Sequence, residues 1–141
     1  MAFRFPLPTD RNGLFDITPQ IQEAIKASGV TDGIAVVATP HTTAGITMVS
    51  YHDPLGLEDV HDEIGRIVPT RIDFKHQYDT PQDAAAHIKT AIVGTSHAFI
   101  VEAAALCLGS SQKIFFWEFD GPRQRTVIVQ IVPVASSGAR G

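Results

Sequence analysis

The chain has 141 residues, of which 44% are hydrophobic and 18% are charged; this balance excludes a disordered protein, and the length suits one domain with its own core. Eleven basic residues against fifteen acidic ones give a formal charge of −4, and the basic residues are scattered along the chain. A protein that binds nucleic acid non-specifically needs a basic stripe, so we expect no nucleic-acid partner.

The cellular location is predicted from the apolar segments. No apolar run is long enough to span a bilayer, and the first residues lack the apolar core of a signal peptide. We therefore expect a cytoplasmic protein that has no membrane partner. Cys107 is the only cysteine and lies in the apolar run 103–108, which predicts a small buried side chain rather than a reactive thiol.

Three helices and seven strands are predicted, in chain order, from the periodicity of apolar residues and from glycine and proline at segment ends. An edge strand at 3–8 comes first. A helix at 16–29 follows, with Thr18 as its cap and Pro19 in its first turn. The later elements are strands at 33–38 and 43–51, helices at about 55–68 and 80–94, and strands at 97–102, 104–108, 113–119 and 126–134.

Residues 70–80 show no period and are predicted to form a loop, and residues 135–141 are predicted to be a disordered tail after a single domain at 1–134. Strands grouped beside few helices favour an α+β fold, with a largely antiparallel two-layer sheet or sandwich and about three helices. Residues 113–119 are apolar on both faces of their strand. Because both faces then need a cover, we expect a second subunit and thus a homo-oligomer.

Six histidines are the main candidates for chemistry in this short chain. His41 follows a proline at the mouth of a strand, beside Thr42 and Thr43, whose hydroxyl groups can orient an imidazole or hold an oxyanion. His76 lies in the polar loop, and His87 flanks the apolar stripe of a helix, where an imidazole needs a hydrogen bond, a metal or a ligand. Three imidazoles can hold zinc with an open fourth position; the alternative is that they are satisfied structural or surface residues.

The remaining polar candidates have simpler expected roles. Surface or capping positions are expected for His52, His61 and His97. Glu118 lies among apolar neighbours, where a carboxylate is costly unless it is paired, so it either forms an ion pair or is functional. Arg123 and Arg125 flank the next turn and either pair with Glu118 or bind phosphate. From its helical position alone, Lys89 is expected at the surface.

Seven short motifs occur together along residues 35–132: His41-Thr42-Thr43-Ala44-Gly45-Ile46-Thr47, Asp53-Pro54, Val60-His61-Asp62, His76-x-Tyr78, Ala86-His87-Ile88-Lys89, Gly94-Thr95-Ser96 and Glu118-Phe119-Asp120-Gly121-Pro122-Arg123. In these motifs and their order the sequence resembles the YjbQ family, also called secondary thiamine-phosphate synthase. The resemblance implies a compact α+β domain of antiparallel sheets, a homotrimer, and a weak thiamine-phosphate-forming activity. It also implies a site made by His41, His76 and His87 near a subunit boundary.

Two segments depart from the family's pattern. Where relatives carry Asn-Glu-Asn before Asp-Pro, this chain has Val49-Ser50-Tyr51-His52, so Ser50 stands at the usual carboxylate position. His52 lies on the same side of an extended strand and is the candidate substitute. Where relatives carry Gly-Thr-Trp-Gln, this chain has Gly109-Ser110-Ser111-Gln112.

We therefore expect an enzyme, or an enzyme-like protein, with a histidine-lined site for a small phosphorylated or anionic ligand. A thiamine-phosphate synthase-like transferase would join a pyrimidine methyl diphosphate to a thiazole phosphate and release pyrophosphate. The expected catalytic residues are His41, His87 and Glu118. The expected ligand-binding residues are Thr42, Thr43, Lys89 and Arg123. The expected ligands of a divalent metal, zinc or magnesium, are His41, His76 and His87. The alternatives are a non-catalytic metal- or ligand-binding homo-oligomer and a structural trimer whose histidines satisfy a polar interface.

Overall fold

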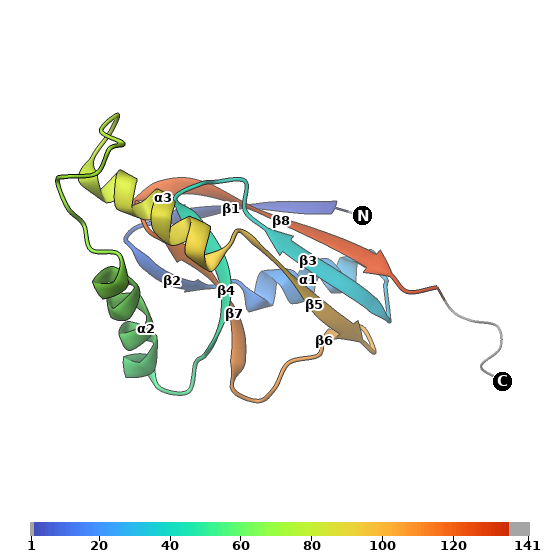
Figure 1. The fold of residues 1–141 in the computed structure, drawn as a ribbon. Helices are drawn as coiled ribbons and strands as arrows, with labels where there is room; N and C mark the ends of the chain where they lie inside the picture. Colours follow the sequence, from blue (N-terminus) through green and yellow to red (C-terminus); the bar gives the residue numbers. More distant parts are fainter. Residues whose placement is uncertain (1, 136–141) are drawn as a thin grey trace.

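The computed structural model describes residues 2–135 (Figure 1). Within this range the elements follow in the order β1 (Ala2–Thr9), β2 (Gly13–Asp16), α1 (Thr18–Ser28), β3 (Gly33–Ala38), β4 (Ala44–Ser50), α2 (Pro54–Ile67), α3 (Pro81–Val93), β5 (Ser96–Glu102), β6 (Ala105–Leu106), β7 (Gln112–Glu118) and β8 (Arg123–Pro133). The predicted α+β class and the three helices are confirmed. Apart from Ala135, the predicted tail lies outside the described residues.

The strands form two antiparallel sheets, which share one core. The larger sheet has the strand order β1-β8-β3-β5-β6, and the smaller sheet has the order β2-β7-β4. Helix α1 contacts β3 and β8 of the larger sheet and β7 of the smaller one. Its Ile17, Ile21 and Ile25 are fully buried and belong to the same apolar cluster as inward-facing residues of both sheets. The alternation of strand side chains thus directs one face of each sheet towards α1.

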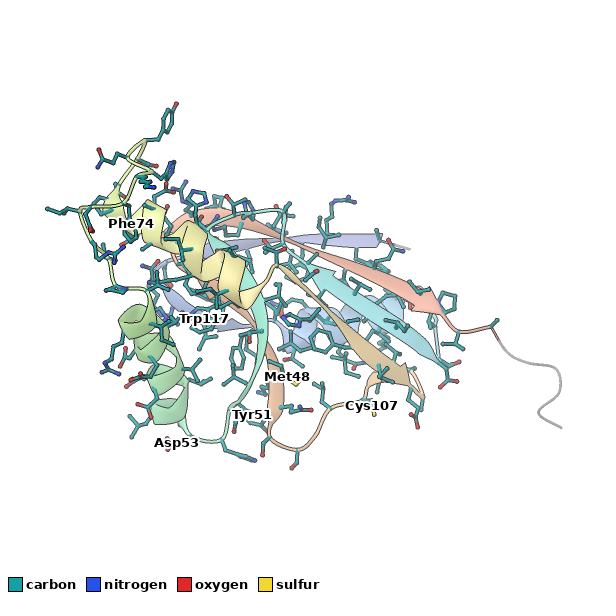
Figure 2. The ribbon with its side chains drawn as sticks, viewed as in Figure 1. Met48, Tyr51, Asp53, Phe74, Cys107 and Trp117 are labelled. Carbon is teal, nitrogen blue, oxygen red and sulfur yellow. The ribbon has the colours of Figure 1, made fainter. Side chains whose placement is uncertain are left out.

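Both faces of β7 are covered by elements of the same chain. Ile114 and Phe116 point into the core beneath α1. Trp117 belongs to a second apolar cluster with Ile64 of α2 and Ala86 of α3, and Figure 2 shows it on the side of the strands where these helices lie. Because α2 and α3 provide the cover, β7 needs no partner subunit for it, and the homo-oligomer stays a prediction.

Three local predictions also differ from the structure. Strand β2 was missed because four residues are too short to show a period, although it pairs with β7 along its whole length. As a result α1 starts later, its N-cap is Ile17, and the side chain of Thr18 bonds the backbone of Ile114 instead of capping the helix. Cys107 is exposed rather than buried (Figure 2), since it follows β6, which is an edge strand of the larger sheet.

Helix α3 forms as its sequence predicts and carries the candidate residue His87. The Thr80 hydroxyl accepts a hydrogen bond from the backbone N–H of Asp83 at 3.1 Å, and proline occupies the first turn. The helix packs closely on β4 at Gly45, where a Cβ atom would lie only 2.8 Å from a backbone oxygen. The oxygen belongs to Gly94, so this close approach fixes the C-terminal end of α3 beside the start of β4, and the loop 68–80 projects at the opposite end of the helix (Figure 1).

The lengths of the helices can be compared with what a membrane span requires. Within residues 2–135, none is long and apolar enough to cross a membrane.

Candidate functional site

A polar hollow of about 430 Å³ lies where the starts of β4, β8 and α3 meet the loop 68–80. Side chains from all four segments line it: Pro40, His41, Thr42, Thr43, His76, Tyr78, Asp79, Asp83, His87, Arg123 and Arg125. The three histidines singled out from the sequence thus face one hollow, together with Thr42, Thr43 and Arg123. Residues far apart in the sequence meet here because antiparallel pairing returns β8 beside β3, whose end leads into the His41 segment.

His76, Asp83 and His87 offer three ligating atoms within 4.8 Å of one another. The Asp83 Oδ2 atom lies 3.2 Å from His76 Nε2 and 3.4 Å from His87 Nε2. Asp83 and His87 are four residues apart on α3 and therefore share one helix face. His76 comes from the loop, and its ring stands edge-on to that of His87 with the centroids 5.3 Å apart.

This group is suited to a divalent transition metal. Two imidazoles and one carboxylate form a donor set that zinc accepts, leaving further positions for water or a ligand. Asp83 was not predicted as a member, because its place in the first turn of α3 has an ordinary capping role. The available signal was the Asp-x-x-x-His spacing at Asp83 and His87, which puts both side chains on one face.

His41 lines the hollow but lies outside this group. Its Nε2 atom accepts a hydrogen bond from the backbone N–H of Thr126 at 3.0 Å. Nε2 therefore carries no proton, and in the neutral ring the proton lies on Nδ1. Burial and the nearby charge of Arg125 lower the pKa of His41, which favours this neutral form. The ring is thus held as a hydrogen-bond donor through Nδ1.

A buried ion pair lies behind the hollow. The Arg125 Nε atom donates to Glu118 Oε1 at 2.7 Å, and Arg125 also donates to Glu118 Oε2 and, at 2.9 Å, to the hydroxyl of Thr43. The Thr9 hydroxyl donates to Glu118 as well, at 2.7 Å. Burial alone would raise the pKa of Glu118, but the hydrogen bonds from Arg125 and Thr9 outweigh it and keep the pKa below its usual value.

Glu118 is fully buried and does not line the hollow. Of the two partners considered from sequence, Arg125 is the one that it pairs with. Arg125 links Glu118 to Thr43, so the carboxylate fixes the mouth of β4 without facing the hollow. Arg125 lines the hollow and Glu118 does not, so Glu118 can influence a ligand there only by holding Arg125 in place.

Arg123 pairs with a different acid. Its Nη2 atom donates to Asp120 Oδ2 at 2.8 Å, and this hydrogen bond raises the pKa of the guanidinium further. Desolvation opposes ionisation of Asp120, but donation from Gln82 and Arg123 keeps its pKa low. Asp79 and Asp83 line the hollow directly. These two carboxylates match the two guanidinium groups of the lining in number, but Arg123 and Arg125 are already paired with Asp120 and Glu118, which leaves the lining carboxylates to attract a cation.

Lys89 lies elsewhere, on the side of α3 that faces β7. Its Nζ atom is 5.8 Å from the ring centroid of Phe119, and burial lowers its pKa. It does not line the hollow. Nearby, the Trp117 indole N–H donates to His61 Nδ1 at 2.9 Å, so His61 supports the packing of α2 rather than pointing freely into water.

The departures from the family's pattern fall at the other end of β4. Ser50 pairs with Gln112 at the last position of the strand, whereas the His41 segment precedes the first. His52 stacks on Tyr51, with ring centroids 5.0 Å apart. Neither Ser50 nor His52 lines the hollow, so within one chain the absent carboxylate leaves the histidine-lined hollow unchanged.

Comparisons with known proteins show which family this chain is similar to. The family profile described as UPF0047 protein YjbQ-like matches residues 4–134. The chain belongs to this family. It is 42% identical over 133 residues to UPF0047 protein MJ1081 of Methanocaldococcus jannaschii, covering 94% of each chain. It is 37% identical over 126 residues to YugU of Bacillus subtilis, covering 88% of this chain and 92% of that one.

Solved structures of similar proteins have the same fold. Hypothetical protein APE1520 from Aeropyrum pernix superposes with a TM-score of 0.88 at 32% identity, covering 95% of this chain and 99% of that one. A YjbQ/UPF0047 family protein from Clostridium acetobutylicum, an orthologue of YugU, superposes with a TM-score of 0.87 at 40% identity, covering 92% and 99%. The predicted family is thereby confirmed.

Proposed function

We propose that this protein binds a divalent metal ion at His76, Asp83 and His87 and holds a small phosphorylated or otherwise anionic ligand against it. The observation that carries the proposal is the convergence of three ligating atoms within 4.8 Å. Two imidazole nitrogens and one carboxylate favour zinc over magnesium, since magnesium prefers oxygen ligands. The metal-binding residues predicted from the sequence are thus changed in one place. Asp83 replaces His41 beside His76 and His87, and His41 instead donates a hydrogen bond through its Nδ1–H group.

The charge of the hollow supports a metal before an anion. Because Arg123 and Arg125 are already paired with Asp120 and Glu118, the lining carboxylates of Asp79 and Asp83 oppose a phosphate, and a divalent cation offsets their charge. Three kinds of donor then surround the space beside the metal: the Nδ1–H group of His41, the hydroxyl groups of Thr42 and Thr43, and the guanidinium of Arg123. These donors suit the oxygen atoms of a phosphate group.

The reaction that we propose for such a site is transfer with diphosphate as the leaving group, in line with the thiamine-phosphate-forming activity that the resemblance implies. The thiazole nitrogen forms a bond to the pyrimidine methylene carbon, and the carbon–oxygen bond to diphosphate breaks, so the electron pair leaves with pyrophosphate. A metal when bound neutralises that charge. Arg123 would hold the departing oxygens, and His41 would donate a hydrogen bond to them.

The first experiment measures metal binding by the full chain, purified without a histidine tag, stripped with a chelator and titrated with zinc. We expect near-stoichiometric binding. Removal of a residue that only hydrogen-bonds to a metal-binding side chain lowers metal affinity roughly 10–100-fold. The variants His87→Ala and Asp83→Asn remove a metal-binding group itself, so their affinity for zinc should fall by more than that. His97→Ala, which changes an exposed histidine outside the hollow, should bind as the wild type does. Absence of bound metal after zinc is added back would refute the proposal.

A second candidate function is non-catalytic binding of a metal or ligand by a homo-oligomer. It is favoured by the burial of Glu118, which leaves no free carboxylate at the predicted catalytic position. Metal-loaded protein that binds pyrophosphate but forms no thiamine phosphate from the two substrates would support this second function. Product formation that falls in His41→Ala protein would support the transferase, because alanine lacks the Nδ1–H donor of the imidazole.

We also propose a homotrimer, for which the outer face of the larger sheet is the candidate surface. Ile34 lies opposite Ile100 on one side and Val132 on the other, and these side chains are 37%, 57% and 44% exposed. Exposed apolar side chains in one row are typical of a protein interface. Light scattering should give about three times the chain mass of 15.2 kDa. Ile100→Lys should reduce that mass, whereas Leu55→Lys on α2 should not.

A further inference from the structure

A second hollow adjoins the histidine-lined one. It measures about 590 Å³ and lies between the loop 68–80 and the outer side of α3, where it is lined by Arg71, Asp73, Phe74, Lys75, His76, Ala84, His87 and Ile88. His76 and His87 line both hollows. The group that we propose to hold metal is therefore the wall between two spaces of different character.

The second hollow is the more apolar of the two. Phe74, Ala84 and Ile88 provide carbon surface, and Phe74 is half-buried beside the start of α3 (Figure 2). The Arg71 guanidinium carbon lies 4.8 Å from the Phe74 ring centroid, and its Nε atom lies 3.2 Å from Asp73 Oδ1. The one carboxylate in the lining of the second hollow, that of Asp73, is thus paired with a guanidinium group. The first hollow is lined by two carboxylates, those of Asp79 and Asp83.

A ligand that reaches the metal group from the polar hollow leaves the rest of its body beside the same two imidazoles. We propose that the second hollow binds the aromatic part of that ligand, and that the ligand is a phosphate ester that carries an aromatic ring. This inference rests on the proposed function, since it assigns a phosphate to the polar hollow. It adds that Phe74 and Ile88 select for a flat apolar group.

The choice of an aromatic group follows from the lining. An aromatic ring packs well on Phe74 and on the edges of imidazole rings, and a guanidinium plane such as that of Arg71 favours a ring face. Small-molecule sites combine a mostly apolar wall with a few polar groups that fix the orientation. The two hollows together provide both, with the polar groups at one end and the apolar wall at the other.

The test compares three probes on metal-loaded full-length protein by calorimetry: phenyl phosphate, methyl phosphate and inorganic phosphate. Burial of one phenyl group should make phenyl phosphate bind roughly 10–100-fold more tightly than methyl phosphate. Phe74→Ala and Ile88→Ala should each remove a large part of that difference and leave zinc affinity unchanged. Ile72→Ala is the matched control, because Ile72 is an exposed apolar residue of the same loop that lines neither hollow.

The outcomes separate this inference from the proposed function. If zinc and all three phosphates bind, but phenyl and methyl phosphate bind equally, the aromatic subsite is refuted and the metal and anion site stands. If Phe74→Ala and Ile88→Ala proteins keep the full preference for phenyl phosphate, the subsite is also refuted. If the protein binds neither zinc nor any phosphate, the proposed function fails and this inference fails with it.

Discussion

The ion pair behind the hollow allows a quantitative prediction. The Glu118 carboxylate is fully buried, and the Arg125 side chain is only 3% exposed. Glu118→Gln keeps the shape of the side chain but leaves the guanidinium without its counter-charge. Breaking a buried pair in this way costs about 3–5 kcal/mol. A domain of this kind has a total stability of about 5–15 kcal/mol, so the variant should lose a large fraction of its free energy of unfolding.

A double-mutant cycle separates the pair from the cost of isolating one charge. Arg125→Met should destabilise the fold about as much as Glu118→Gln does, because each leaves the other group unmatched. The double variant should cost less than the two single variants together, since no buried charge remains unpaired. Thr9→Val removes one donor to Glu118 and should cost roughly 1.5–3 kcal/mol. Urea unfolding followed by the fluorescence of the single tryptophan measures all four.

The dependence of stability on pH tests the same contact independently. Because the pKa of Glu118 is lower in the folded protein than its ordinary value of 4.5, its stabilising contribution is complete above that value. It is lost as the pH falls through the folded-state pKa. Glu118→Gln should therefore flatten the acid limb of the stability curve. A variant within about 1 kcal/mol of the wild type, with an unchanged acid limb, would refute the reasoning.

Three further predictions concern the rest of the fold. Burial lowers the pKa of His61, and protonation would remove the acceptor of the Trp117 indole; unfolding free energy should therefore fall as the pH drops from 6.5 towards the folded-state pKa, and His61→Gln should weaken that fall. Ala103 has a φ of 52° in an exposed turn, so Ala103→Gly should stabilise the protein by about 1 kcal/mol in urea unfolding. Gly33→Ala would press a Cβ atom into a backbone oxygen of β8, whereas a Cβ atom at Gly65 on α2 meets nothing within 4 Å. Thermal melting should show a lower midpoint for Gly33→Ala and a higher one for Gly65→Ala, whose free energy of unfolding should rise by about 1 kcal/mol.

Local sequence signals were enough for the elements whose reasons are local. Helix α3 has its hydroxyl cap, its first-turn proline and a stripe of alanines within one segment, and it forms where they predict. The family was also recognisable from short motifs. Each motif, such as the one with His41 at a strand mouth or the one with Gly121 in a turn, lies within a few consecutive residues and can be read from the sequence alone. The segments that bear His76 and His87 were singled out for the same reason.

The elements that were missed depend on distant partners. Strand β2 exists because Gly13–Asp16 pairs with β7, which lies about a hundred residues later in the chain. Two apolar faces on β7 did not reveal which element covers them, since apolar alternation records burial but not the identity of the covering surface. Cys107 likewise stands in an apolar run that the structure leaves at an exposed sheet edge.

The chemistry of the site was decided by the tertiary structure. The sequence by itself determined the α+β class, the family and the three histidines worth considering. Only the folded chain determined that Asp83 lies between His76 and His87, and that His41 has its Nε2 atom occupied by a backbone N–H. It also determined that Glu118 pairs with Arg125 and not with Arg123. Residue type sets which bonds a side chain can make, whereas long-range strand pairing and helix packing set which partners come within bonding distance.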